Sequence, residues 1–105
     1  MQISEIANVF SALGNPRRLF VFLTIVRLEP ICVCDIMRIT GYPQSSVSRA
    51  LSLLRLMGLV NFERHGTRVC YYLNTDNPVV TYLKDFLNRI DIPEASKLEK
   101  FEKSC

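Results

Sequence analysis

Apolar side chains at the start of the chain recur with the spacing of an α-helix. The first such set comprises Ile3, Ile6, Ala7, Phe10 and Leu13. It predicts a helix over residues 3–13, which Gly14 ends. Asn15 and Pro16 then supply the cap and first position of a second helix, and Glu29–Pro30 stops it. The buried stripe of this second helix is expected to comprise Leu19, Phe22, Leu23 and Val26.

Residues 32–57 predict two helices joined by a tight turn. The shorter one runs from Cys32 or Val33 to Thr40, and the longer one is expected over residues 44–57. The longer helix separates its apolar and polar residues onto two faces. The apolar face carries Val47, Ala50, Leu51 and Leu54. The polar face carries Ser45, Ser48, Arg49 and Ser52, and includes no acidic residue.

The pattern changes to a period of two over residues 59–74, which predicts a β-hairpin with residues 64–67 as its basic tip. A further helix opens at Asn77–Pro78 and carries a strong apolar stripe, namely Val79, Leu83, Phe86, Leu87 and Ile90. The sequence therefore predicts a mainly α-helical domain over residues 1–92, with about five helices and a two-stranded hairpin. Residues 93–105 are a charged tail, for which a short helix and a mobile segment are both open.

Positive charge is concentrated in the middle of the chain, although the net charge is only +3. Residues 38–75 contain five arginines against a single acidic residue, Glu63. This distribution fits either an ordinary solvated surface or a nucleic-acid-binding face, because arginine suits phosphates and base edges, and charge alone does not favour the second. The longest apolar run, residues 19–26, is too short to span a bilayer, and no secretory signal is visible. We therefore expect a cytoplasmic protein with no membrane partner.

Two helices joined by a tight turn and followed by a basic hairpin are typical of a winged helix-turn-helix. Small residues on the outer face of the longer helix let it approach closely in a major groove, which is about 12 Å wide. Gln44 and Arg49 are the best candidates for reading adenine and guanine edges. The candidate DNA-binding residues are Gln44, Ser45, Ser46, Ser48, Arg49, Ser52, Arg64, His65, Thr67 and Arg68. We expect double-stranded operator DNA as the partner, and neither enzymatic activity nor a catalytic cofactor.

Four cysteines occur, and Cys32 and Cys34 form a close pair at the predicted start of the third helix. A disulfide framework is not expected in a chain with ample apolar content and no export signal. Thiolates bind soft ions, so the pair is a candidate metal site. Residues i and i+2 of an ideal helix differ by about 200°, so one ion bound by both sulfurs should distort the first turn of that helix. Cys70 is expected on the polar face of the hairpin, as an ordinary thiol.

The sequence resembles the ArsR/SmtB family of metal-responsive winged-helix repressors over roughly residues 4–90. The matching segments are residues 12–19, 31–36, 45–54 and 58–60. The Cys-Val-Cys-Asp segment is similar to the signature of the arsenic- and antimony-sensing branch. The resemblance implies a homodimer that represses its operator until trivalent arsenic or antimony, or an organoarsenical, binds Cys32 and Cys34. Some members of this branch carry a third cysteine where this chain has Met37, and Cys105 is then a possible third ligand.

The apolar stripe on residues 79–90 exceeds what one small core requires, and with residues 3–13 it predicts a two-fold dimer interface. Its candidate residues are Ile3, Ile6, Phe10, Val79, Leu83, Phe86, Leu87 and Ile90. Other functions stay open at this point. The cysteine pair also suits a DNA-binding redox or persulfide sensor. A small dithiol oxidoreductase lacks its usual Cys spacing and βαβ setting here, and a winged helix that only binds proteins is disfavoured by the serine and arginine face.

Overall fold

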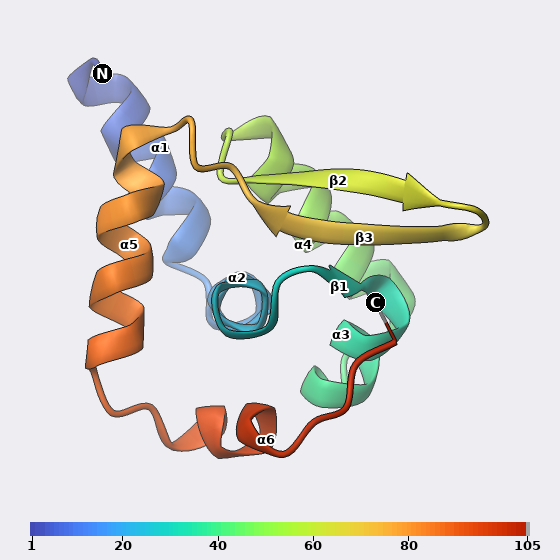
Figure 1. The fold of residues 1–105 in the computed structure, drawn as a ribbon. Coiled ribbons are helices and arrows are strands. Elements are labelled where there is room, and N and C mark those ends of the chain that lie inside the picture. The colour runs from blue at the N-terminus through green and yellow to red at the C-terminus, as the bar shows by residue number, and fades with distance from the viewer. Residues whose placement is uncertain (105) are drawn as a thin grey trace.

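The computed structural model describes residues 1–104, which form helices around a small antiparallel sheet (Figure 1). The helices are α1 (Ile3–Leu13), α2 (Pro16–Leu28), α3 (Val33–Thr40), α4 (Gln44–Leu56), α5 (Pro78–Arg89), the 3-10 helix η1 (Pro93–Ala95) and α6 (Ser96–Glu99). The strands are β1 (Ile31–Cys32), β2 (Val60–His65) and β3 (Arg68–Leu73). Figure 1 shows α2 end-on at the centre, with α1 and α5 on one side and α3 and α4 on the other. The predicted winged helix-turn-helix fold is confirmed.

Helix boundaries follow from local chemistry. The side chain of Asn15 accepts hydrogen bonds from the backbone N–H groups of Arg17 and Arg18, at 3.0 and 3.2 Å, and so caps α2. Asn77 caps α5 in the same way, by accepting one backbone N–H at 3.1 Å. α3 ends at Gly41, whose φ of 74° is a left-handed conformation that glycine adopts without strain. These boundaries lie where the sequence predicts them.

The sheet contains one strand more than the predicted hairpin. β2 and β3 pair antiparallel along their whole lengths, with His65 opposite Arg68 at the tip. β1 joins the other edge of β3, which gives the strand order β1-β3-β2. The tip is also tighter than predicted, because Arg64 and His65 belong to β2 and only residues 66–67 turn the chain. A strand of two residues has too little alternation to be visible in a sequence pattern, and this is why β1 is missed.

The third strand changes the surroundings of Cys70. The alternation of the hairpin predicts that Cys70 lies on a polar face, yet its exposed fraction is 3%. Cys32 of β1 lies directly opposite Cys70 in the ladder. The expectation of a polar-face position is therefore wrong, because it assumes a sheet of two strands with this edge open to solvent. The expectation of an ordinary thiol is wrong as well, because Cys70 is disulfide-bonded.

The hydrophobic core surrounds α2, in which every residue from 21 to 26 is buried. Leu19, which the sequence assigns to the buried stripe, is exposed instead at the side of α2 that faces α1 and α5. Among the described residues, no single helix has the length and apolarity to cross a membrane. α1 and α2 meet those criteria of length and composition only as a pair, bent by 97°.

Residues 93–104, which the sequence groups by charge as part of a tail, return to the body of the domain. Ala95 and Leu98 are buried in the core, with Leu98 only 2% exposed. Beyond α6 the chain runs back to the start of α3 and approaches the wing (Figure 1). The charged composition conceals this packing, because only two large apolar residues, Leu98 and Phe101, occur after residue 93.

Candidate nucleic-acid interface and cysteine site

The recognition helix of the predicted helix-turn-helix is α4, which packs against α2 and α3. Its predicted apolar face is buried throughout, comprising Val47, Ala50, Leu51 and Leu54. Its predicted DNA-facing residues Gln44, Ser45, Ser48, Arg49 and Ser52 are exposed, and Ser46 is half-buried. Pro43 precedes the helix and offers no side-chain cap, so the first backbone N–H groups of α4 are open to a phosphate. This arrangement suits insertion of α4 into a groove.

Arg17, at the start of α2, belongs to the same surface. Its guanidinium donates to the hydroxyl of Ser46 at 3.1 Å and lies 4.9 Å from the centre of the Tyr42 ring. These two contacts hold a positive charge beside the N-terminal end of α4. Sequence reasoning misses Arg17 because 29 positions separate it from Ser46. The only signal in the sequence is that a basic residue, with no acidic residue beside it, directly follows Pro16, which starts α2.

The wing carries the second predicted group of DNA-binding residues. Arg64 and Thr67 are exposed near its tip, and His65 lies 3.4 Å from the Glu63 carboxylate. Arg55 of α4 stacks over the ring of Phe62 at 4.2 Å, which fixes the wing relative to the recognition helix. Arg68 differs from the other wing arginines, since its guanidinium donates to the backbone carbonyl of Ser104. A contact between the wing and the end of the chain was not foreseen from the sequence.

Cys32 and Cys34 lie at the junction of β1 and α3 but in different surroundings. Cys32 is 5% exposed and is the N-cap residue of α3, with φ −90° and ψ 163°. Cys34 lies within the first turn of α3 and is exposed. Of the two helix starts that the sequence predicts, Val33 is confirmed, so Cys32 is extended and only Cys34 is helical. One sulfur is nevertheless in the interior and the other at the surface, so binding both to one ion still requires this junction to rearrange.

The described residues give the cysteine pair no further ligand. Within residues 1–104, no three His, Cys, Asp or Glu side chains are grouped so that they could hold a metal ion. Met37 is half-buried and packs against the core. Cys105, the possible third ligand, lies outside the described residues.

Asp35 follows the cysteine pair and is completely buried, with an exposed fraction of 0%. Its carboxylate accepts hydrogen bonds from both the backbone N–H and the hydroxyl of Ser104, the latter at 3.1 Å. Arg38, one turn further along α3, lies 3.4 Å from the same carboxylate. A buried charge is tolerated only when it is paired and hydrogen-bonded, so these contacts account for the placement of Asp35.

The candidate dimer face lies on α1 and α5. Ile3, Phe10, Phe86 and Ile90 are exposed, whereas Ile6, Val79 and Leu83 are partly buried. A cavity of about 650 Å³ between α1, α2 and α5 is lined almost entirely by apolar side chains, including Phe10, Leu83 and Phe86. Leu87 also lines this cavity, although it is 5% exposed and packs in the core of its own chain, and its place in the interface stays a prediction.

Comparisons with known proteins identify relatives of this chain. Residues 16–61 match the model of the family described as bacterial regulatory protein, arsR family. The chain is 35% identical over 89 residues to a transcriptional repressor SmtB homolog from Synechocystis, an alignment that covers 85% of this chain and 66% of that protein. It is 34% identical over 71 residues to the arsenical resistance operon repressor of Escherichia coli K12, covering 68% of this chain and 61% of that protein. The chain thus spans slightly less than two thirds of each relative.

Among solved structures, the fold is similar to the homodimeric winged helix-turn-helix DNA-binding domain of a possible ArsR-family transcriptional regulator from Mycobacterium bovis. The TM-score is 0.70 at 29% identity, and the match covers 82% of this chain and 77% of that one. The proteins named here are regulators rather than enzymes, as expected for this chain. They include an SmtB homolog as well as an arsenical resistance repressor, so the comparisons do not single out the arsenic-sensing branch.

Proposed function

The chain belongs to the arsR family of bacterial regulatory proteins, and from this premise we propose that it is a homodimeric, cytoplasmic transcriptional repressor with a thiol-based inducer site. Trivalent arsenic or antimony, or an organoarsenical, binds Cys32 and Cys34 and releases the dimer from its operator. The observation that carries this proposal is the position of the two cysteines at the junction of β1 and α3. α3 packs directly on the recognition helix, so a change at its first turn alters how α4 is presented to DNA.

Operator recognition uses the exposed face of α4. Gln44 and Arg49 reach base edges in the major groove, and the serines of this face bind phosphates and bases at close approach. Arg17 and the open N–H groups at the start of α4 position the helix on the phosphate backbone. Arg64, His65, Thr67 and Arg68 bring the wing to the neighbouring backbone.

Dimerisation places two such faces on one operator. Phe10 and Phe86 lie on adjoining helices and are exposed to 63% and 56%, which is unusual for large aromatic residues in a monomer. A second copy of the same surface, related by a two-fold axis, buries them and closes the apolar cavity between α1, α2 and α5. The solved structure of a homodimeric relative supports this arrangement.

Inducer binding uses the soft sulfur ligands that trivalent arsenic and antimony prefer. With a monosubstituted arsine oxide, two arsenic–sulfur bonds form, and the two thiol protons leave with the oxide oxygen as water. The Cys32 sulfur is buried and the Cys34 sulfur is exposed, so the two reach one ion only if the first turn of α3 opens. Coupling between two sites is typically about 1–3 kcal/mol, so two occupied sites in a dimer give about 2–6 kcal/mol, enough to empty an operator.

Cys105 is the proposed third ligand for inorganic arsenite, which takes three sulfurs. The support is the contact of the preceding residue, Ser104, with Asp35 beside the cysteine pair. Met37, which stands where a third cysteine occurs in some similar proteins, is a thioether and a poorer ligand. An organoarsenical already has one arsenic–carbon bond, so Cys32 and Cys34 are sufficient to complete its coordination.

The central test measures operator release by fluorescence anisotropy, using DNA from upstream of the protein's own gene and protein kept reduced. Arsenite is expected to release the wild type, and neither Cys32→Ser nor Cys34→Ser should respond. Val33→Ala is the matched control, since it changes the residue between the two cysteines and leaves both sulfurs in place, and it should respond as the wild type does. Induction that is unchanged in Cys32→Ser overturns the sensing assignment, and release by peroxide without arsenite favours a redox sensor instead.

The third ligand is tested by comparing arsenite with phenylarsine oxide. Cys105→Ser is expected to lose its response to arsenite and to keep its response to phenylarsine oxide, because the latter needs only two sulfurs. An equal response of the wild type and Cys105→Ser to arsenite removes Cys105 from the site.

A further inference from the structure

The end of the chain lies across the first turn of α3. After α6, residues 100–104 run past the junction of α2, β1 and α3 and stop beside the wing (Figure 1). The Lys103 ammonium donates to the carbonyl oxygens of Leu28 and Glu29, at 2.9 and 3.3 Å. These carbonyls end α2, so this contact joins the last residues of the chain to the segment that leads into β1.

Two further contacts place this segment on α3 itself. The ring of Phe101 lies 4.9 Å from the guanidinium carbon of Arg38, a cation–π contact. Ser104 supplies two donors, its N–H and its hydroxyl, to the fully buried carboxylate of Asp35. Apart from Ser104, the only described partner of this carboxylate is Arg38, and the Arg38 side chain is 61% exposed. Ser104 therefore provides the interior hydrogen bonds that make the buried position of Asp35 tolerable.

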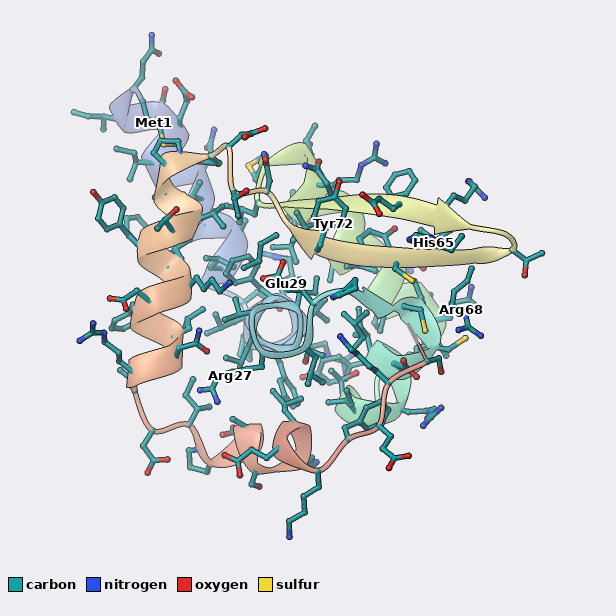
Figure 2. All side chains as sticks on the ribbon, in the orientation of Figure 1. Met1, Arg27, Glu29, His65, Arg68 and Tyr72 are labelled. Atoms are coloured by element: carbon teal, nitrogen blue, oxygen red, sulfur yellow. The ribbon has the colours of Figure 1, made fainter. Side chains whose placement is uncertain are left out.

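The same segment also reaches the DNA-binding wing. The carbonyl of Ser104 accepts a hydrogen bond from Arg68, and Figure 2 shows the Arg68 side chain beside the end of the chain. One residue thus contacts both the carboxylate that follows the cysteine pair and an arginine of the wing.

We propose that residues 100–104 form a strap that is closed in the inducer-free protein, with Asp35 as its latch, and that an organoarsenical, which needs no sulfur besides Cys32 and Cys34, opens it when it binds. The first part concerns the free protein alone, and the second part rests on the proposed function. The strap is anchored at its base by Leu98, which is buried in the core, so α6 stays folded when residues 100–104 are released. Opening also detaches the half-buried Phe101 from the edge of the core.

Asp35 couples the two events because it is joined to Cys34 by one peptide bond. If the first turn of α3 opens to bring both sulfurs to one ion, the Asp35 carboxylate leaves the position in which Ser104 binds it. Strap closure and inducer binding then oppose each other. By thermodynamic linkage the opposition is reciprocal, so a weakened strap tightens inducer binding by the same factor by which the inducer weakens the strap.

The experiment uses Ser104→Pro, because proline lacks the N–H and the hydroxyl that Asp35 accepts, while Asp35 and every cysteine are unchanged. Glu102→Ala is the matched control, since it alters the same segment at an exposed residue for which no contact is described. Limited tryptic cleavage at the Lys100–Phe101 bond, followed by mass spectrometry, reports whether the strap is open. Cleavage after Lys103 is not used, because a proline at position 104 blocks it.

Without inducer, Ser104→Pro should be cleaved at least about tenfold faster than the wild type, because the loss of one charge-assisted hydrogen bond already corresponds to that factor and this variant loses two. Glu102→Ala should match the wild type. Phenylarsine oxide should accelerate cleavage of the wild type and leave Ser104→Pro unchanged, and Ser104→Pro should release DNA at a several-fold lower concentration of this probe.

The outcomes separate the strap from the sensing assignment. Equal cleavage of the wild type and Ser104→Pro in the free proteins overturns the strap, whatever the inducer does. The coupling is overturned by a different pair of results. The free proteins differ in cleavage, and phenylarsine oxide binds the wild type and releases it from DNA, but it does not change the cleavage of the wild type. If phenylarsine oxide releases no DNA from any variant, the proposed function fails while the comparison of free proteins still decides the latch.

Discussion

The salt dependence of operator binding tests the DNA-binding face most directly, with Arg17→Ala as the perturbation. Arg17, Arg49 and Arg64 are exposed, and within residues 1–104 none of them forms an ion pair with an acidic residue. If each contacts a phosphate, a dimer neutralises about six phosphates, and log affinity should fall with log salt at a slope of about −5.4. Arg17→Ala removes about two of these contacts and should reduce the slope to about −3.6.

The predicted slopes translate into a difference that is easy to measure. Raising the salt fourfold should weaken the wild type about 2,000-fold but Arg17→Ala only about 150-fold. Fluorescence anisotropy with a labelled operator, at several potassium chloride concentrations, gives both slopes. The loss of affinity should be similar for operator and unrelated DNA, because a phosphate contact carries no sequence information.

Arg89→Ala is the matched control for the loss of one arginine per chain. Arg89 lies at the end of α5 and donates to Asp85 at 2.9 Å, and this hydrogen bond and the charge of Asp85 raise the pKa of Arg89. The control therefore removes a full positive charge outside the proposed DNA-binding face and should keep the wild-type slope. An unchanged slope in Arg17→Ala, or an equal reduction in both variants, would refute the assignment of Arg17 to the phosphate backbone.

Three further predictions concern assembly and stability. Phe86→Asp should convert the dimer to monomers in light scattering and weaken operator binding, because it places a charge in the centre of the proposed interface, and a variant that stays dimeric would exclude α5 from it. Leu98→Ala should reduce the free energy of unfolding by about 2–5 kcal/mol in urea titrations at matched protein concentration, since Leu98 is fully packed; a loss near zero would mean that α6 does not belong to the core. Asn15→Ala should cost about 1 kcal/mol in the same assay through loss of the cap on α2, whereas Asn8→Ala, at an exposed position inside α1, should cost much less.

The sequence predicts those parts of the fold that neighbouring residues determine. Asn15 and Asn77 cap their helices through residues two or three positions away, and Gly41 ends α3 through its own backbone conformation. The buried face of α4 follows from helical periodicity within one segment. In each case the interaction that decides the structure lies inside the window that a sequence pattern covers.

The features that were missed depend on contacts between distant residues. β1 exists because Ile31 and Cys32 pair with β3, and two residues carry no periodic signal of their own. Arg17 joins the recognition surface through Ser46, and Ser104 reaches Asp35 across 69 positions. The charge pattern of the last residues leaves a short helix and a mobile tail open, and it gives no sign that one serine completes the hydrogen bonding of a buried carboxylate.

Cys32 belongs to two elements at once, and both adjoin parts of the proposed DNA-binding surface. An ion bound at Cys32 therefore acts on DNA binding through directly neighbouring elements. Cys32 is the last residue of β1, paired with the wing strand β3, and it is also the N-cap of α3, which supports α4. A displacement of Cys32 toward Cys34 therefore disturbs the pairing with the wing strand and the first helical turn together. Because wing and recognition helix must fit adjacent parts of one operator, a small change in their relative position is enough to lose contacts on both. Release in this scheme requires no change in the proposed dimer interface on α1 and α5.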